Sequence, residues 1–434
     1  MKSYYGEETK KALRNFPFET HKTRLEFILA IVEIKKAAAI ANYKAGNLSR
    51  DIQNAIVKAC DEILRGKYNN QFPLPSLQGG AGTASNMNVN EVIASVAALI
   101  LKNKIKVHPN DHVNKSQSTN DVNPSALKIS ALHLISDLND KLSSLSKSLE
   151  IKSKEFKNIK KLGRTHLQDA VPTTLGAEFK VYAENLKRYE SQIKMAEDLC
   201  RVLNLGGTAI GNSINASPAY TREVYKELNK ITDEKFHKAD NMMAKTGSQT
   251  DFLIISQTIT ALCVDLSKVA NDLRFMASGP KGGIGEIILP ELQRGSSIMP
   301  GKVNPVMPET VNQLYYLVSG NNLSIEKAVE GAQMELGVML PVVVDKLIES
   351  IKLTAEVINQ FDKLCVKGIK ADKKRCEYHL ENSTAYATLL VPYLGYDAVS
   401  SIVKKSISSN KTLREIVVGE KYLKENKFDK IIRM

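Results

Sequence analysis

The sequence has little of what would hold a small secreted or metal-binding protein together. It has no tryptophan, and its five cysteines, among 434 residues, are odd in number, lie far apart and form no CxxC pair. This pattern favours neither a disulfide framework nor a zinc site. No apolar run reaches the roughly 18 residues that span a bilayer, and the N-terminal residues lack the apolar stretch of a signal peptide. We therefore expect a cytoplasmic protein with reduced thiols and no membrane partner.

Acidic residues are outnumbered, since 60 lysines and arginines face 47 aspartates and glutamates and give a net charge of +13. The lysines are scattered along the chain rather than grouped in one arm, so we expect no nucleic-acid partner. A positive field would instead draw in a small anionic ligand. The 43% hydrophobic and 25% charged residues are ordinary for a globular protein, and the length suffices for about three domains.

Helical periodicity dominates the rest of the pattern. Apolar residues recur at steps of three and four along 252–276, which predicts a long helix with a bundle seam. A second seam, 131–149, follows Pro124, which we expect in the first helical turn. Residues 177–203 and 305–330 also have a helical pattern, whereas alternating strands with hairpin turns are hard to find. The sequence therefore predicts an all-α fold.

Three glycine-rich stretches interrupt the helices and are expected to be irregular: Gly79–Gly82, Gly206–Gly211 and Gly279–Gly301. None has the spacing of a nucleotide-binding loop or a preceding strand. The sequence also has no dinucleotide fingerprint and no metal-ligand motif, so we expect neither a required cofactor nor a metal site. Functional residues often lie on such loops, and these stretches are the first places to look for chemistry.

The last of these stretches ends in GSSIMPGKVNP at 295–305, which places two hydroxyls, a cation and an amide on a flexible arm. This segment resembles the signature loop of the fumarase/aspartase superfamily. Three more segments match the same family in the expected order, at 82–91, 108–120 and 163–166. The resemblance covers nearly the whole chain. It implies a lyase that breaks a bond β to a carboxylate of a small dicarboxylate and releases fumarate.

The leaving group is the open question within the family. Several segments resemble the aspartase branch, and Ala81 stands where fumarases typically have a serine, whose hydrogen bond a methyl group cannot donate. The aspartase-like segments are YYG at 4–6, QGGAGT at 78–83, PELQ at 290–293 and VMPE at 306–309. We therefore expect reversible deamination of L-aspartate to fumarate and ammonia.

Two alternatives remain. Class II fumarate hydratase is the first, because HPND at 108–111, THL at 165–167 and LGYD at 394–397 occur in both branches or lean towards fumarases. A non-catalytic helical scaffold is the second, and it is disfavoured because the loop residues are all present. Some positions depart from the family pattern and bear on substrate preference rather than on reaction class: Ala177, Asn212, Ser213, Gly337 and Leu340.

The resemblance also implies roles for individual residues. Ser296 would be the general base that removes the Cβ proton through an aci-carboxylate intermediate, and a mere lid contact is the alternative role. His166 would position the amino group, and Glu309 would orient His166. The remaining implied residues bind the substrate: Thr83, Ser118, Thr119 and Ser297 at the β-carboxylate, Lys302 and Asn304 at the α-carboxylate, and Asn120 and Thr165 beside His166.

The family architecture supplies the expected organisation. It implies an N-terminal helical domain at 1–117, a central long-helix bundle at 118–373 and a small C-terminal helical domain at 374–434. Four central bundles would pack into a twenty-helix core of a homotetramer, with each active site shared between three subunits. Activation by Mg²⁺ is an expectation from family analogy alone.

Overall fold

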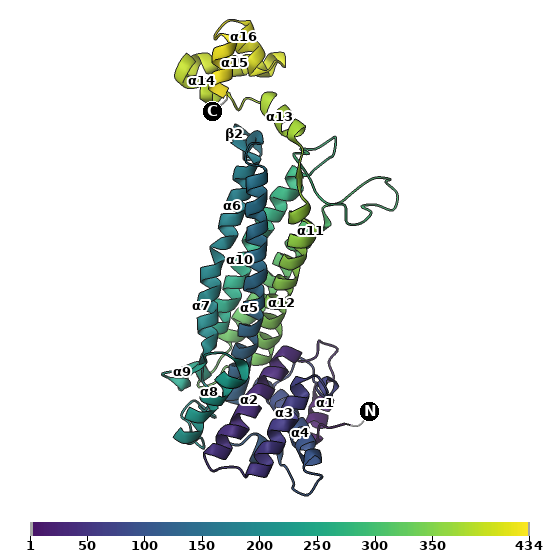
Figure 1. Cartoon of the computed structure of the whole chain (residues 1–434), viewed down its shortest axis with the longest axis vertical. Coiled ribbons are helices and arrows are strands. Elements are labelled where there is room, and N and C mark those ends of the chain that lie inside the picture. The colour runs from purple at the N-terminus through teal and green to yellow at the C-terminus, as the bar shows by residue number, and fades with distance from the viewer. Residues whose placement is uncertain (1–2, 433–434) are drawn as a thin grey trace. The chain divides into compact units, whose positions relative to one another are not determined.

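The computed structural model describes residues 3–432, which are mostly helical (Figure 1). The chain divides into two compact units, each built from three stretches of sequence. Unit 1 consists of Met1–Asp140, Glu190–Cys263 and Leu314–Glu356, and unit 2 consists of Lys141–Tyr189, Val264–Gln313 and Val357–Met434. The division into three domains expected from the sequence stays a prediction.

The long helices are α5 (Thr119–Glu155), α10 (Thr250–Met276), α11 (Val306–Glu330) and α12 (Leu340–Leu364). The seam predicted along α10 is confirmed, because the residues that form it are all buried: Phe252, Ile255, Ile259, Leu262, Leu266, Val269, Leu273 and Met276. The seam at 131–149 is buried along α5 in the same way. Apolar side chains at three- and four-residue spacing therefore form the core-facing stripes of these helices.

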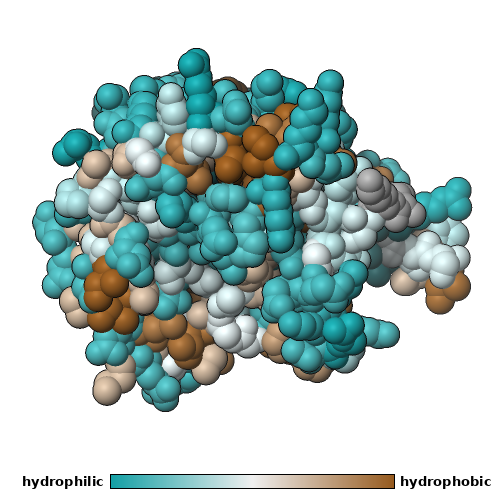
Figure 2. Space-filling view, turned by 90° about the horizontal axis from the view of Figure 1, so that it is seen from below, coloured by the Kyte–Doolittle hydropathy of each residue, from teal (hydrophilic) through white to brown (hydrophobic). Residues whose placement is uncertain are grey.

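By length and composition alone, α10 could cross a membrane, and half of its most apolar window is buried. Core helices of soluble proteins pass the same test. On the face drawn in Figure 2, hydrophilic residues dominate and apolar residues form separate patches. Scattered apolar residues are ordinary on a protein surface and need no special partner.

The shorter helices belong to one unit or the other. In unit 1, α1–α4 lie side by side (Figure 1), and α2 also packs against α8. The bounds in unit 1 are α1 (Glu7–Asn15), α2 (Leu25–Lys44), α3 (Arg50–Leu64), α4 (Thr83–Ile100), α8 (Pro218–Thr232) and α9 (Met242–Gly247), with short turns η1 (Asn69–Gln71), η2 (Gly80–Gly82) and η3 (Pro109–Val113). Those in unit 2 are α6 (Leu175–Lys187), η4 (Val366–Gly368), α13 (Lys373–Glu381), α14 (Ala387–Leu394), α15 (Tyr396–Ser409), α16 (Leu413–Gly419) and α17 (Glu425–Ile432), while α7 covers Tyr189–Arg201.

The all-α expectation needs one correction, because the structure contains short strands. An antiparallel hairpin joins β1 (Lys160–Thr165) to β2 (Gln168–Thr174), and its turn residues His166 and Leu167 both have positive φ. Neither is a glycine or asparagine, so the sequence gives no hairpin-turn signal here. The other strands have two residues each and pair as β3 (Val202–Leu203) with β4 (His237–Lys238) and β5 (Ile287–Ile288) with β6 (Lys370–Ala371).

Pro124 does not lie in the first helical turn as expected but inside α5, which begins at Thr119. A proline there has no N–H for the carbonyl four residues earlier, which belongs to Asn120. The side-chain amide of Asn204 donates to that carbonyl instead, at 3.1 Å. The helix therefore continues through Pro124 because another segment of unit 1 satisfies the freed acceptor.

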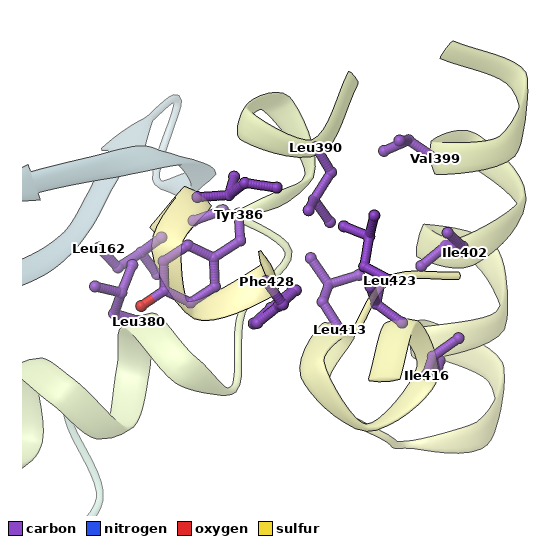
Figure 3. Close-up of a cluster of buried hydrophobic side chains, with 13 residues drawn as sticks. Leu162, Leu380, Tyr386, Leu390, Val399, Ile402, Leu413, Ile416, Leu423 and Phe428 are labelled. Atoms are coloured by element: carbon purple, nitrogen blue, oxygen red, sulfur yellow. The ribbon is translucent and has the colours of Figure 1, made fainter. Parts of the chain in front are cut away.

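The C-terminal helices of unit 2 enclose a separate apolar cluster (Figure 3). Tyr386, Leu413 and Phe428 lie within it, and Leu162 of β1 reaches it from the hairpin. Burying each such side chain contributes about 1.5–3 kcal/mol. The cluster therefore holds β1, and with it the hairpin, against the C-terminal helices.

Candidate active site

The residues assigned by resemblance fall into both units. Unit 1 holds Thr83, Ser118, Thr119 and Asn120, and unit 2 holds Thr165, His166, Ser296, Ser297, Lys302, Asn304 and Glu309. Each group is described within its own unit.

Thr83 begins α4 directly after a tight glycine turn. Its hydroxyl donates to the carbonyl of Gly80 at 2.7 Å, while Ala81 and Gly82 both have positive φ. A Cβ atom at Gly82 would lie 2.9 Å from the amide nitrogen of Asn123. That amide nitrogen donates to the carbonyls of Ala81 and Gly82, at 3.1 Å each. The turn therefore needs glycine at 82 and holds the first residue of α4 in place.

Ser118, Thr119 and Asn120 form the start of α5. The hydroxyl of Ser118 accepts from the backbone N–H of Asn120 at 3.2 Å, which caps the helix. Asn86, one turn after Thr83 on α4, donates to the hydroxyl of Thr119 at 3.3 Å. The structure thus ties the start of α5 to α4. The N-terminus of a long helix carries a partial positive charge, which suits a carboxylate.

Behind this segment lies a buried polar network that the sequence analysis missed. The side-chain oxygen of Asn114 accepts from the ammonium of Lys35 at 2.7 Å and from Asn86 and Asn90 at 3.3 Å. Burial lowers the pKa of Lys35 to about 7. Burial also raises the pKa of Asp121 to about 6, against the opposing effect of its backbone hydrogen bonds. Little in the sequence signals this network, because Lys35 lies beside Lys36 and close to Glu33 in the middle of α2.

The loop at 295–305 in unit 2 closes on itself at its base. The backbone N–H of Gly295 donates to the carbonyl of Lys302 at 2.8 Å, and the side-chain amide of Asn304 donates to the carbonyl of Gly295 at 2.8 Å. The side-chain amide of Asn304, the predicted carboxylate ligand, is therefore hydrogen-bonded within the loop. Lys302 and Ser297 are exposed, and no ion pair in residues 3–432 involves Lys302.

The hydroxyl of Ser296 sits at the centre of this loop. It accepts the backbone N–H groups of Ile298 at 3.2 Å and Met299 at 3.1 Å. Two such donors stabilise negative charge on the oxygen, as a serine acting as a base requires. Ile298 is 84% exposed, so the tip of the loop projects into solvent.

Thr165 and His166 lie at the exposed turn of the β1–β2 hairpin. The hairpin is anchored by Glu286, which is fully buried and pairs with Arg164 at 2.8 Å and Lys161 at 2.9 Å. In the part of the chain that the structure describes, no hydrogen bond or ion pair joins His166 to Glu309. The expected orientation of His166 by Glu309 stays a prediction.

No group of three or more histidine, cysteine or acidic side chains that could hold a metal ion occurs in residues 3–432. Apart from His166 and Glu309, the predicted site residues supply one cation, Lys302, and otherwise hydroxyls, amides and backbone N–H donors. Such a set can bind carboxylates and stabilise a developing anion.

Comparison with known proteins identifies the family. Residues 1–320 match the Lyase family, and residues 387–434 match the Fumarase C C-terminus family. An aspartate ammonia-lyase of Helicobacter pylori is 42% identical over 436 residues, which cover 99% of this chain and 93% of that protein. A class II fumarate hydratase of Bacillus subtilis is 38% identical over 434 residues, which cover 99% and 94%.

The structure agrees with these sequence matches. A solved structure of a fumarate lyase:delta crystallin from Brucella melitensis, bound to cobalt, has a TM-score of 0.96 and 41% identity, and the match covers 100% of this chain and 95% of that one. The sequence matches, the fold and the ordered motifs agree along the chain, and the family acts on dicarboxylates. The chain therefore belongs to the fumarase/aspartase superfamily of lyases.

Proposed function

We propose that this lyase catalyses the reversible deamination of L-aspartate to fumarate and ammonia. The observation that carries the choice of leaving group is Ala81, which is buried in the turn before Thr83 and presents a methyl group where fumarases typically have a serine. The full-length identity to aspartate ammonia-lyases supports the same choice.

In the proposed reaction, the β-carboxylate of aspartate binds at Thr83 and the start of α5, where Ser118 and Thr119 supply hydroxyls. Ser296 removes the Cβ proton, and the electron pair moves into the β-carboxylate to form the aci-carboxylate dianion. The hydroxyls and the partial positive charge at the start of α5 stabilise that dianion. The C–N bond then breaks, the Cα–Cβ double bond of fumarate forms, and the nitrogen leaves as ammonia.

Serine is a poor base in water, so its activation needs a structural cause. The N–H groups of Ile298 and Met299 already point at its oxygen, and closure of the exposed loop over substrate would exclude water from it. These donors favour the role of base over that of a lid contact, which needs no charge stabilisation. Lys302, without an ion-pair partner in residues 3–432, would bind the α-carboxylate together with Asn304.

The remaining parts of the proposal are a homotetramer, active sites shared between three subunits, a cytoplasmic location and no required cofactor. Sharing would bring the groups of unit 1 and unit 2 from different chains to one substrate. Activity that survives EDTA treatment would support the absence of a required metal, and adding Mg²⁺ afterwards tests activation.

The decisive experiment supplies fumarate with and without ammonium. Formation of aspartate in ammonium buffer supports the proposal, whereas formation of malate in both buffers identifies a class II fumarate hydratase. The 38% identity to a fumarate hydratase is the reason that malate is measured as well. A protein that gives neither product would be the non-catalytic scaffold.

Ser296→Ala tests the base. We expect kcat to fall about 10²–10⁴-fold while aspartate binding changes little, because a positioned general base contributes to the transition state alone. Steady-state kinetics and aspartate binding by calorimetry measure the two effects. Near-normal turnover would leave Ser296 as a lid contact, and His166 would be the next residue to replace.

Lys302→Ala tests the carboxylate clamp. Loss of the pairing should cost about 2–5 kcal/mol, which corresponds to a fall of tens to thousands of fold in kcat/KM, mainly through KM. Lys281→Ala is a matched control, since Lys281 is also an exposed lysine and lies in the 279–301 segment that directly precedes Lys302. Equal KM values for the two variants would remove Lys302 from the site.

A further inference from the structure

The buried carboxylate of Asp121 connects two segments of unit 1 that are distant in sequence. Its Oδ1 accepts the backbone N–H of Ser118 at 2.9 Å. Its Oδ2 accepts the backbone N–H groups of Gly206 and Thr208, at 3.0 Å each. Asp121 is fully buried. One side chain therefore holds both the start of α5 and the glycine-rich segment Gly206–Gly211.

Asn204 makes a second connection between the same segments. Its amide nitrogen donates to the carbonyl of Asn120 at 3.1 Å and to the hydroxyl of Thr246 at 2.8 Å. Its oxygen accepts from the hydroxyl of Ser125 at 3.2 Å. Since Pro124 leaves the Asn120 carbonyl without a helical donor, Asn204 supplies the bond that this turn of α5 lacks.

The glycine-rich segment in turn contacts a side chain of the proposed site. The amide nitrogen of Asn120 donates to the carbonyl of Ala209 at 2.8 Å. Gly206 and Gly211 have φ of +86°, which glycine adopts freely, but Thr208 has φ of +60°, which is strained for a residue with a Cβ atom. Such a conformation persists only when the surroundings fix it. The two N–H bonds to Asp121 are part of what fixes it, and so they determine where the amide of Asn120 is held.

Capping the N-terminus of α5 alone would need fewer hydrogen bonds than Asp121 makes. Capping of α5 uses only Oδ1 of Asp121 and the hydroxyl of Ser118. The bonds from Gly206 and Thr208 to Oδ2 add nothing to the helix end. They serve to keep the Gly206–Gly211 segment, and hence the Ala209 carbonyl, beside Asn120.

We propose that Asp121 and Asn204 are positioning residues for the lyase reaction, holding the side chain of Asn120 against the Gly206–Gly211 segment so that it meets the substrate in a fixed orientation. This inference rests on the proposed function in one respect, because it takes Ser118, Thr119 and Asn120 as substrate-binding residues. Neither Asp121 nor Asn204 needs to touch the substrate.

Asp121→Asn and Asn204→Ala test the proposal in the full-length enzyme. In Asp121→Asn one acceptor oxygen remains, but an NH₂ group faces N–H donors at the other position. We expect KM for the amino acid to rise tenfold or more in both variants, with a fall in kcat, since a misplacement of about 1 Å can cost 10²-fold in rate. Kinetic constants are expressed per folded active enzyme, with the folded fraction taken from circular dichroism.

Glu91→Gln is the matched control. Glu91 is also a buried carboxylate of unit 1 that holds backbone N–H groups of another segment, namely those of Gly6, Glu8 and Thr9. It contacts none of the proposed site residues through a hydrogen bond in the part of the chain that the structure describes. We expect this variant to lower thermal stability and to leave KM unchanged.

The outcomes separate cleanly. If Asp121→Asn and Asn204→Ala lose stability as Glu91→Gln does but keep the wild-type KM and kcat, the residues are only structural and the proposal is wrong. If Asp121→Asn does not fold, Asn204→Ala, which removes no charge, decides alone. Should the wild type produce malate rather than aspartate, the proposed function fails. KM and kcat of the same variants are then measured with malate as the substrate, so the positioning role is still tested.

Discussion

Replacing Glu286 with glutamine neutralises a carboxylate that has no solvent contact and pairs with two cations of β1, Lys161 at 2.9 Å and Arg164 at 2.8 Å. Removing one member of a buried ion pair typically costs about 3–5 kcal/mol, because an uncompensated charge stays buried. Lys161 keeps a second partner, Glu178, at 2.8 Å. Most of the lost stability therefore comes from breaking the pair with Arg164. The Arg164 side chain is 18% exposed and can be partly hydrated, which favours the lower end, about 3 kcal/mol.

Urea unfolding followed by circular dichroism at 222 nm measures this loss, at one fixed protein concentration because assembly shifts apparent stability. Glu184→Gln on α6 is the control, since its 3.6 Å pair with Lys180 is exposed and should contribute nothing measurable. Glu286→Gln should also lower activity under native conditions, because the hairpin carries Thr165 and His166 at its turn. Equal unfolding midpoints for the two variants would refute the reasoning that the buried pairs anchor the hairpin.

Three further predictions concern stability and assembly. Burial raises the pKa of Glu33 from 4.5 to about 7, against the opposing effect of Lys36. Between these two pH values the native state keeps a proton that the unfolded chain releases, so stability falls as pH rises from about 4.5 to about 7. Glu33→Gln should therefore be more stable than wild type at pH 8, by up to about 3 kcal/mol, and equal to it at pH 4, as pH-dependent urea melts would show. Phe428→Ala should cost about 3–5 kcal/mol and speed hydrogen exchange in 387–432, whereas unchanged exchange would contradict the packing in Figure 3. Light scattering should report about four chains per particle, and active monomers would contradict shared sites.

The helices were predictable because their information is local. The three- and four-residue spacing along 252–276 specifies which side of a helix is buried, and the structure buries those residues in α10. The family motifs were equally readable, since each is a contiguous string. Gly206–Gly211 is irregular, as the sequence predicted, whereas Gly79–Gly82 contains the short turn η2 and Gly279–Gly301 contains the two-residue strand β5.

The features that the sequence did not reveal depend on partners far along the chain. The hairpin turns at His166 and Leu167 without a turn-forming residue, and its strand β1 is held by Glu286, more than 120 residues later. Helix α5 passes Pro124 only because Asn204 satisfies a carbonyl 84 residues away from it in sequence. Lys35 is tolerated inside unit 1 because Asn114, 79 residues later, accepts its hydrogen bond. The periodicity of apolar residues contains no information about such long-range pairings.

The burial of all five cysteines makes the chain suitable for site-directed labelling. Each thiol is buried, and burial raises the pKa of Cys200, Cys263 and Cys376 to about 12, so little thiolate forms near neutral pH. Maleimides react with the thiolate, so the unmodified protein should react with them very slowly. A cysteine introduced at Ile298, on the exposed tip of the Ser296 loop, would be the dominant reactive thiol. A fluorophore at that position would test whether the loop moves during turnover, without first removing any native cysteine.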